Sequence, residues 1–361
     1  MGEHMVKKAI ADLKPYTPEL TLEDLKQREG LSKLVRLSAN ENAFGTSPKV
    51  AEALSNWGFT GANRYPDSNM TTLRDAIASR LNVSADALVF GNGLDEILAL
   101  LSRTLVEPGD EVIVAEPTFS EYALNAVVEG AKMVDVSVNA AGVTDLSSFT
   151  EAITPKTRMI WICNPNNPTG TFVSKEDIAA FMKTVPATVT VIVDEAYIDF
   201  TTAEADPSAI TLMKDFANLV VLRTFSKAYG LANFRVGYAI VSPQLGNQLE
   251  RVRLPYNLST FAEVAATAAY QDQDFVSKTV TAVAAERDKW EQFLNDQGLT
   301  FYSSQANFIF FKVGKADALA ANLLKNGYLL RTGLGDDWLR VTIGRPEDNQ
   351  AVQTLIARFL K

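Results

Sequence analysis

Histidine and cysteine are nearly absent from this chain of 361 residues, which has one of each, His4 and Cys163. A single cysteine cannot form an internal disulfide or a CxxC site, and a single histidine cannot build a metal centre that needs several imidazoles. His4 stands in a leading stretch that resembles a start or cloning remnant, so a Ser-His-Asp triad is not expected. Proton transfer near neutral pH must then fall to Lys, Tyr, Asp, Glu or a bound cofactor.

Excess positive charge and long apolar runs are also lacking. There are 34 basic against 43 acidic residues, a formal net charge of −9, which disfavours bulk binding to nucleic acid or anionic membranes. No apolar run reaches the roughly 18 residues of a membrane span, and residues 1–20 lack the apolar stretch of a signal peptide. With 47% apolar residues, we expect a cytoplasmic globular protein with one large and one smaller domain.

The apolar pattern predicts an α/β fold. Leu73, Ile77 and Leu81 are spaced as one face of a helix. Short β-branched runs alternate with helical stretches, which is typical of a mainly parallel sheet buried on both faces. These runs cover 88–90, 112–115, 133–138, 159–163, 189–193, 219–222 and 236–241. Residues 261–297 read as helical, and 307–313 and 339–343 as strands of an α+β unit, so we place a domain boundary near 255–270.

Polar residues gather where the predicted strands end, the edge at which open α/β sheets bind ligands. Gly91-Asn92-Gly93 lies between a strand and a helix, where free backbone N–H groups could cradle an anion. The same residues could form a plain turn, because short glycine motifs are weak signals. The third glycine of a GxGxxG dinucleotide motif is missing, which disfavours a dehydrogenase.

Two further segments follow apolar strands. Residues 164–170, Asn-Pro-Asn-Asn-Pro-Thr-Gly, predict a rigid turn that also forms a platform of amides. Asp194 ends an apolar strand, and a buried carboxylate there is costly unless it is paired. It is either the N-cap of a helix or a carboxylate that awaits a cationic partner.

Lys227 stands among small and apolar residues in the segment 224–232. A lysine in such surroundings can have a lowered pKa and act as an amine nucleophile, although most lysines extend to the surface. Arg235 suits a phosphate or a carboxylate. A phosphate cradle, a buried acid, a tyrosine, a lysine and an arginine together match the needs of pyridoxal phosphate.

The order of these motifs resembles that of the fold-type I pyridoxal-phosphate-dependent aminotransferases, most closely the class II branch that acts on histidinol phosphate. The resemblance covers nearly the whole chain. It is carried by residues 37–42 (LSANEN), 64–67 (RYPD), 91–96 (GNGLDE), 116–120 (EPTFS), 164–170 (NPNNPTG), 194–200 (DEAYIDF), 224–232 (TFSKAYGLA) and 339–344 (LRVTIG). It implies a large domain with a mainly parallel seven-stranded sheet between helices and a smaller α+β domain. The expected limits are 1–45 for an N-terminal arm and part of the small domain, 46–260 for the cofactor domain and 261–361 for the small domain.

The resemblance also implies roles around the cofactor ring. Lys227 is expected to bond to the cofactor aldehyde, and Asp194 to pair with the pyridine nitrogen. Tyr197 and Asn167 are expected to donate to the phenolic oxygen, and Phe119 to lie against the ring.

Further roles concern the cofactor phosphate, the second subunit and the substrate. The phosphate would be held by Gly93, Leu94, Asp95, Thr224, Ser226 and Arg235. Tyr65 would reach the cofactor of a neighbouring subunit, which makes the expected unit a homodimer with shared sites. The substrate would be bound by Tyr16, Asn42, Arg331 and Arg340.

The implied reaction converts L-histidinol phosphate and 2-oxoglutarate to imidazole acetol phosphate and L-glutamate. An aromatic or broad-specificity aminotransferase is the alternative, and a lyase or decarboxylase with the same cofactor is a further one. A non-catalytic regulator would need a DNA-binding module, for which the N-terminal arm is too short. Three places depart from the usual pattern: Leu94, where Ser is common, residues 232–235, and residues 42–45, where Phe44 could alter substrate choice.

Overall fold

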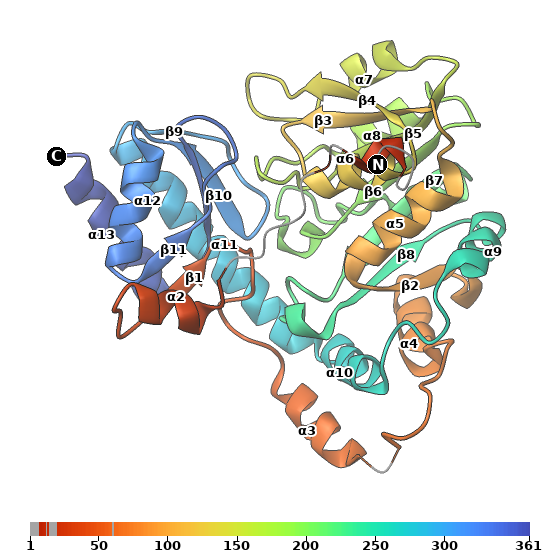
Figure 1. The fold of residues 1–361 in the computed structure, drawn as a ribbon, viewed down its shortest axis with the longest axis horizontal. Helices are drawn as coiled ribbons and strands as arrows, with labels where there is room; N and C mark the ends of the chain where they lie inside the picture. Colours follow the sequence, from red (N-terminus) through yellow and green to blue (C-terminus); the bar gives the residue numbers. More distant parts are fainter. Residues whose placement is uncertain (1–6, 12, 14–19, 60) are drawn as a thin grey trace, which may run out of the picture.

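The structure is a computed structural model that describes residues 7–11, 13, 20–59 and 61–361. Figure 1 shows two units: a large sheet with helices on both faces, and a smaller unit that contains the C-terminus. The N-terminal strand β1 (Val35–Leu37) pairs in parallel with β11 (Tyr328–Leu330), so this early segment belongs spatially to the smaller unit. The predicted domain limits remain a prediction.

The large sheet has seven strands in the order β2-β8-β7-β6-β5-β3-β4. In the described sheet β8 alone runs opposite to the other six strands, which confirms the expected mainly parallel sheet. In chain order the strands are β2 (Leu88–Asn92), β3 (Glu111–Glu116), β4 (Lys132–Ser137), β5 (Thr157–Cys163), β6 (Thr190–Asp194), β7 (Leu219–Thr224) and β8 (Val236–Ile240).

Each central strand contributes side chains to two apolar cores, one on each face of the sheet, because alternate side chains point to opposite faces. Val191 and Val193 of β6 belong to one apolar cluster, and Ile192 between them belongs to the other. The helices that cover the sheet are α4 (Thr71–Leu81), α5 (Gly93–Leu105), α6 (Ser120–Val128), α7 (Leu146–Ala152), α8 (Lys175–Met182) and α9 (Pro243–Val252). Burial on both faces explains why the strands read as continuous apolar runs.

The smaller unit holds an antiparallel sheet in the order β12-β10-β9. Its strands are β9 (Thr300–Phe301), β10 (Phe308–Lys312) and β12 (Trp338–Thr342), and its helices include α12 (Ala316–Lys325) and α13 (Pro346–Phe359). The helical stretch expected over 261–297 forms α10 (Thr260–Gln271) and α11 (Gln273–Asp296), and α11 reaches from the large unit to the small one (Figure 1).

The remaining helices lie near the N-terminus: α1 (Lys8–Ala11), α2 (Leu22–Arg28) and α3 (Pro48–Trp57). Helix α3 packs beside α10 at the edge of the large unit (Figure 1). Among the described residues, no helix is both long enough and apolar enough to cross a membrane.

Candidate active site

The carboxyl ends of β5, β6 and β7 bring three of the polar segments to one edge of the sheet. Cys163 at the end of β5 pairs with Asp194 at the end of β6, and Asp194 pairs with Leu222 of β7. The segments 164–170, 194–200 and 224–232 therefore leave the sheet side by side. This is the sheet edge at which the sequence placed the ligand.

Asp194 is a buried carboxylate whose two oxygens both accept hydrogen bonds. The Ala196 amide donates to Oδ1 at 3.0 Å, and the Tyr122 hydroxyl donates to Oδ2 at 2.7 Å. Burial raises the pKa of Asp194 to about 6, and the Tyr122 hydrogen bond opposes this rise. Near neutral pH the carboxylate is ionised inside the protein, as a group that pairs with a cation must be.

Lys227 lies inside the same edge. Its Nζ donates to the Ala39 carbonyl oxygen at 3.2 Å and lies 5.6 Å from the centre of the Tyr197 ring. Burial, and then the positive charge of Arg340, lower the Lys227 pKa to about 8. A larger share of the amine is therefore neutral near pH 7, which is what a nucleophile or a base needs.

Tyr197 and Asn167 carry hydrogen-bond donors at the same sheet edge. Burial raises the Tyr197 pKa to about 12, so its hydroxyl keeps its proton, and its oxygen accepts from Asn40 Nδ2 at 3.1 Å. The Asn167 Oδ1 accepts from Arg340 Nη1 at 2.5 Å, so the NH₂ end of this amide points elsewhere as a donor. The pair can hold a negatively charged oxygen.

Gly93 and Arg235 form an anion cradle at the start of α5. Gly93 has φ +76°, its N–H donates to the Arg235 carbonyl oxygen at 2.8 Å, and a Cβ there would collide with the Arg235 guanidinium. The guanidinium therefore crosses the backbone where the helix begins, next to unpaired N–H groups. Its Nη2 meets Asp95 Oδ2 at 3.1 Å, and half-buried Leu94 stands between Gly93 and Asp95 in the chain.

Thr224 and Ser226 lie at the end of β7, and the Thr224 Oγ1 accepts from the Ser226 amide at 3.0 Å. Phe119 borders the same edge: its ring meets Tyr122 edge to face, with centres 5.5 Å apart. Tyr122 in turn stacks flat on Trp161 at 4.6 Å. A buried acid, an interior lysine, two donors and an anion cradle together fit pyridoxal phosphate.

Arg331 and Arg340 face each other across an isolated antiparallel bridge, with backbone hydrogen bonds of 3.1 and 3.0 Å. Directly opposed residues put their side chains on the same face, so the two guanidinium groups belong to one side of the small unit. Arg340 is buried and also donates to the Ser38 carbonyl oxygen at 2.7 Å, whereas Arg331 is exposed.

The other predicted substrate and subunit residues are placed less directly. The Asn42 amide donates to the Ala228 carbonyl oxygen and accepts from the Phe44 N–H, both at 2.9 Å, so it ties its loop to the lysine segment. Tyr65 is 81% exposed and stacks on Tyr256 at 4.6 Å, in contrast to the interior residues above. Tyr16 lies outside the described residues.

Two residues of the site were not singled out from the sequence. Tyr122 follows Phe119 by three positions, a helical spacing that places both on one face and is the signal that could have found it. Asn40 stood inside the recognised segment 37–42 without a role, and nothing in the sequence gives the direction of its hydrogen bonds.

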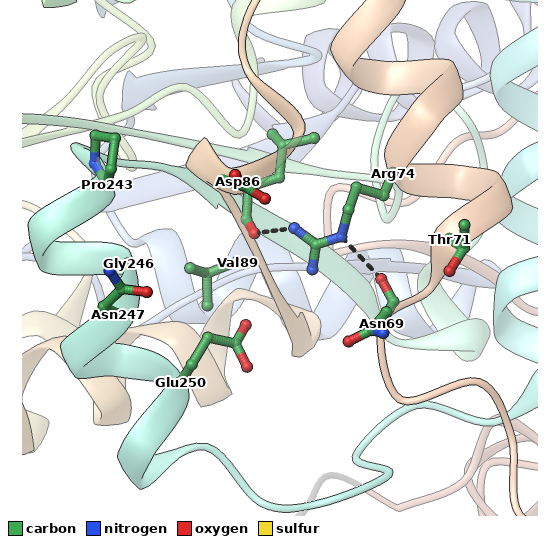
Figure 2. A pocket seen from close by; sticks show the side chains of 10 residues that line it. Asn69, Thr71, Arg74, Asp86, Val89, Pro243, Gly246, Asn247 and Glu250 are labelled. Atoms are coloured by element: carbon green, nitrogen blue, oxygen red, sulfur yellow. Dashed lines mark hydrogen bonds between the residues drawn. The ribbon is translucent and has the colours of Figure 1, made fainter.

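A pocket of about 470 Å³ opens elsewhere, between α4, β2 and α9. Figure 2 shows Arg74 reaching across it toward Asn69. Arg74 donates to the carbonyl oxygens of Asn69, Ala85 and Leu88 at 2.6–2.9 Å, which holds α4 against the start of β2. None of the candidate site residues that the structure describes lines this pocket, so it is separate from the lysine site.

Comparison with known proteins assigns the family. The family model for aminotransferase class I and II matches residues 32–358. The histidinol-phosphate aminotransferase of Lactiplantibacillus plantarum is 49% identical over 354 residues, 98% of this chain and 99% of that protein. The enzyme of the same name from Limosilactobacillus fermentum is 49% identical over 358 residues, 99% of each.

Among solved structures, the histidinol-phosphate aminotransferase from Sinorhizobium meliloti in complex with pyridoxal-5′-phosphate matches with a TM-score of 0.89. The two sequences are 26% identical, and the match covers 99% of this chain and 98% of that one. These findings confirm the fold and the resemblance inferred from the motifs. The chain belongs to the aminotransferase class I and II family.

Proposed function

We propose that this protein is a pyridoxal-phosphate-dependent aminotransferase that converts L-histidinol phosphate and 2-oxoglutarate to imidazole acetol phosphate and L-glutamate. The observation that carries the proposal is the interior Lys227, with its lowered pKa, at the same sheet edge as the buried carboxylate of Asp194. The names of the relatives with 49% identity support the choice of substrate.

The bound cofactor would supply an electron sink for the bond that breaks at the substrate Cα. The residues of this chain do the rest. Asp194, ionised and held by two donors, stabilises a positive charge at the pyridine nitrogen. Tyr197 and the Asn167 NH₂ group donate to the phenolic oxygen, and the Gly93–Arg235 cradle holds the phosphate.

Lys227 has two tasks in this proposal. It would hold the cofactor by a covalent bond, and once the substrate amine has replaced it there, its neutral amine would take the proton from the substrate Cα. A pKa near 8 makes the amine both a competent base and, once protonated, a competent acid.

Arg331 and Arg340 lie on one side of the small unit and would bind the anionic end of the substrate. A guanidinium fork matches a phosphate ester and a carboxylate equally well in geometry. The two arginines therefore support both histidinol phosphate and an amino acid as donors, and 2-oxoglutarate as the acceptor. The test is a panel of amino donors: kcat/KM should be far higher for histidinol phosphate than for phenylalanine, and the reverse would favour the aromatic aminotransferase.

A homodimer with shared sites belongs to the same proposal. Tyr65 stacks on Tyr256, and Leu254, two positions before Tyr256, is 65% exposed. Phe59, which meets Phe261, is 74% exposed. Exposed aromatic clusters are typical of protein interfaces. This surface supports burial against a second copy, with Tyr65 entering the partner's phosphate site. We place the enzyme in the cytoplasm, which fractionation of cells would test.

A further inference from the structure

Asn40 connects the smaller unit to the lysine site. It is 1% exposed, follows β1, and has φ +55°, a left-handed backbone that asparagine tolerates better than most residues. The Asn307 amide donates to its carbonyl oxygen at 3.1 Å, and its side chain reaches Tyr197. Every polar group of Asn40 is thus engaged by a residue of another segment.

The hydrogen bonds around Asn40 place its Oδ1 toward Thr342 and its Nδ2 toward Tyr197. The Asn40 N–H donates to Thr342 Oγ1 at 2.9 Å, so that oxygen accepts there. The single hydroxyl proton of Thr342 then points to Asn40 Oδ1, 3.1 Å away, because this oxygen can only accept. Nδ2 is left to face Tyr197 Oη at 3.1 Å, and an amide group at this position donates.

The Tyr197 oxygen therefore accepts from Asn40, and its own proton must go to a different acceptor. Because burial raises the Tyr197 pKa to about 12, that proton stays on the hydroxyl at neutral pH. The ring is held in place by Phe308, edge to face at 5.1 Å. Lys227 Nζ lies over the same ring, so an acceptor bonded to Lys227 is near at hand.

We propose that Asn40, locked by Thr342, is a positioning residue that turns the Tyr197 proton toward the phenolic oxygen of the cofactor. This rests on the proposed function, because it needs pyridoxal phosphate bonded to Lys227. A hydrogen-bond donor at the phenolic oxygen stabilises the negative charge of that oxygen. This stabilisation is largest when the nitrogen that joins Lys227 to the cofactor carries no proton. The Tyr197 hydrogen bond therefore lowers the pKa of that nitrogen, which the visible absorption band reports.

Asn40→Asp reverses the hydrogen bond with almost no change in shape. A carboxylate only accepts, so it would take the Tyr197 proton away from the cofactor. We expect the midpoint of the visible-band pH titration to rise by about one unit, the size of one hydrogen bond to a charged group. The effect of the added charge is measured separately by making Asn40→Asp in a Tyr197→Phe background. There the Tyr197 hydroxyl is gone, so only the direct effect of the charge on the midpoint remains. Equal shifts in the two backgrounds would overturn the proposal.

Thr342 gives a second test that adds no charge and decides the matter if Asn40→Asp does not fold. Thr342→Val removes the hydroxyl that donates to Asn40 Oδ1, so the Asn40 amide can turn Oδ1 to Tyr197. The midpoint of the visible-band pH titration should then rise. Thr342→Ser keeps the hydroxyl and should leave the midpoint at the wild-type value. An unchanged midpoint in folded Thr342→Val overturns this inference. A wild-type protein without any visible band on incubation with pyridoxal phosphate would instead overturn the proposed function.

Discussion

The hydroxyl of Tyr122 donates a hydrogen bond of 2.7 Å to Oδ2 of Asp194. Both groups are buried, and the tyrosine ring is held by its flat stack on Trp161. The two residues are 72 positions apart, and the contact exists because α6, which packs on β3 and β4, brings the Tyr122 side chain to Asp194 at the end of β6. Burial alone favours the protonated carboxyl, so this hydrogen bond helps to keep Asp194 ionised.

Tyr122→Phe should therefore weaken the binding of pyridoxal phosphate and make it more sensitive to acid. The ionised form of Asp194 exists above its pKa of about 6 and is lost as the pH falls through that value. Without the hydroxyl the pKa rises, so the loss of affinity should begin at a higher pH. We expect roughly tenfold weaker binding at pH 7, measured by titration of the apoprotein.

Tyr270→Phe is the matched control for this loss of a hydroxyl. Tyr270 is also buried, and its Oη has no hydrogen-bond partner among the described residues. Its replacement should leave cofactor affinity and its pH dependence unchanged. Equal losses in the two variants would mean that the Tyr122–Asp194 hydrogen bond has no special part in holding the cofactor.

The lowered pKa of Lys227 predicts how quickly the apoprotein bonds to pyridoxal phosphate. Only the neutral amine attacks an aldehyde, so the rate should rise with pH through about 8 and level off above it. Stopped-flow absorbance would measure this profile. Lys227→Ala should form no covalent bond, and reduction with borohydride followed by peptide mapping would identify the lysine. A label on another lysine contradicts the assignment.

Arg223 forms a buried ion pair with Glu195 at 2.7 Å and a longer contact with Asp199 at 3.5 Å. Arg223→Met leaves the Glu195 carboxylate buried and uncompensated, so we expect a loss of about 3–5 kcal/mol in the free energy of unfolding. Adding Glu195→Gln should recover part of that loss. The exposed Arg28–Glu29 pair is the control, since Arg28→Ala should leave the denaturation midpoint nearly unchanged. Urea titration measures all three variants against the wild-type protein.

Arg331 is expected to distinguish donors by their anionic end. Arg331→Gln should lower kcat/KM for histidinol phosphate by about ten- to a hundredfold, because a dianionic phosphate loses more than a carboxylate when one guanidinium is removed. The loss for phenylalanine should be smaller. Arg358→Gln, in the last turn of α13, serves as the control for a general loss of positive charge. Equal losses for both donors would argue against a phosphate-binding Arg331.

The sequence predicted the large sheet closely because its strands are buried on both faces and therefore read as apolar runs. The end of β6 at Asp194 followed from composition and spacing alone, and so did a helix next to Gly91-Asn92-Gly93, although α5 begins at Gly93 itself and not after it. Contacts between distant segments did not follow from composition and spacing. The spacing from Phe119 could have placed Tyr122 in the site, but neither its bond to Asp194 nor the amide orientation of Asn40 can be read from local sequence, because each joins segments far apart in the chain. The resemblance supplied residue roles that periodicity could not give.

The last prediction concerns Tyr65, whose exposed ring contrasts with the buried positions of Asp194 and Tyr197. If it completes the site of a partner subunit, Tyr65→Ala and Lys227→Ala are each impaired in both sites of a homodimer. A mixed dimer has one site that carries both substitutions and one that carries neither. Mixing the two variants under conditions of subunit exchange should therefore restore up to about a quarter of the wild-type kcat, because half of the dimers are mixed and each has one intact site. The control is Tyr302→Ala, which changes a ring stacked on Trp338 within the small unit. Mixed with Lys227→Ala, it should give no more activity than the Tyr302→Ala protein has by itself. No recovery from the Tyr65 and Lys227 pair, in a mixture shown to exchange subunits, would place Tyr65 outside the shared site.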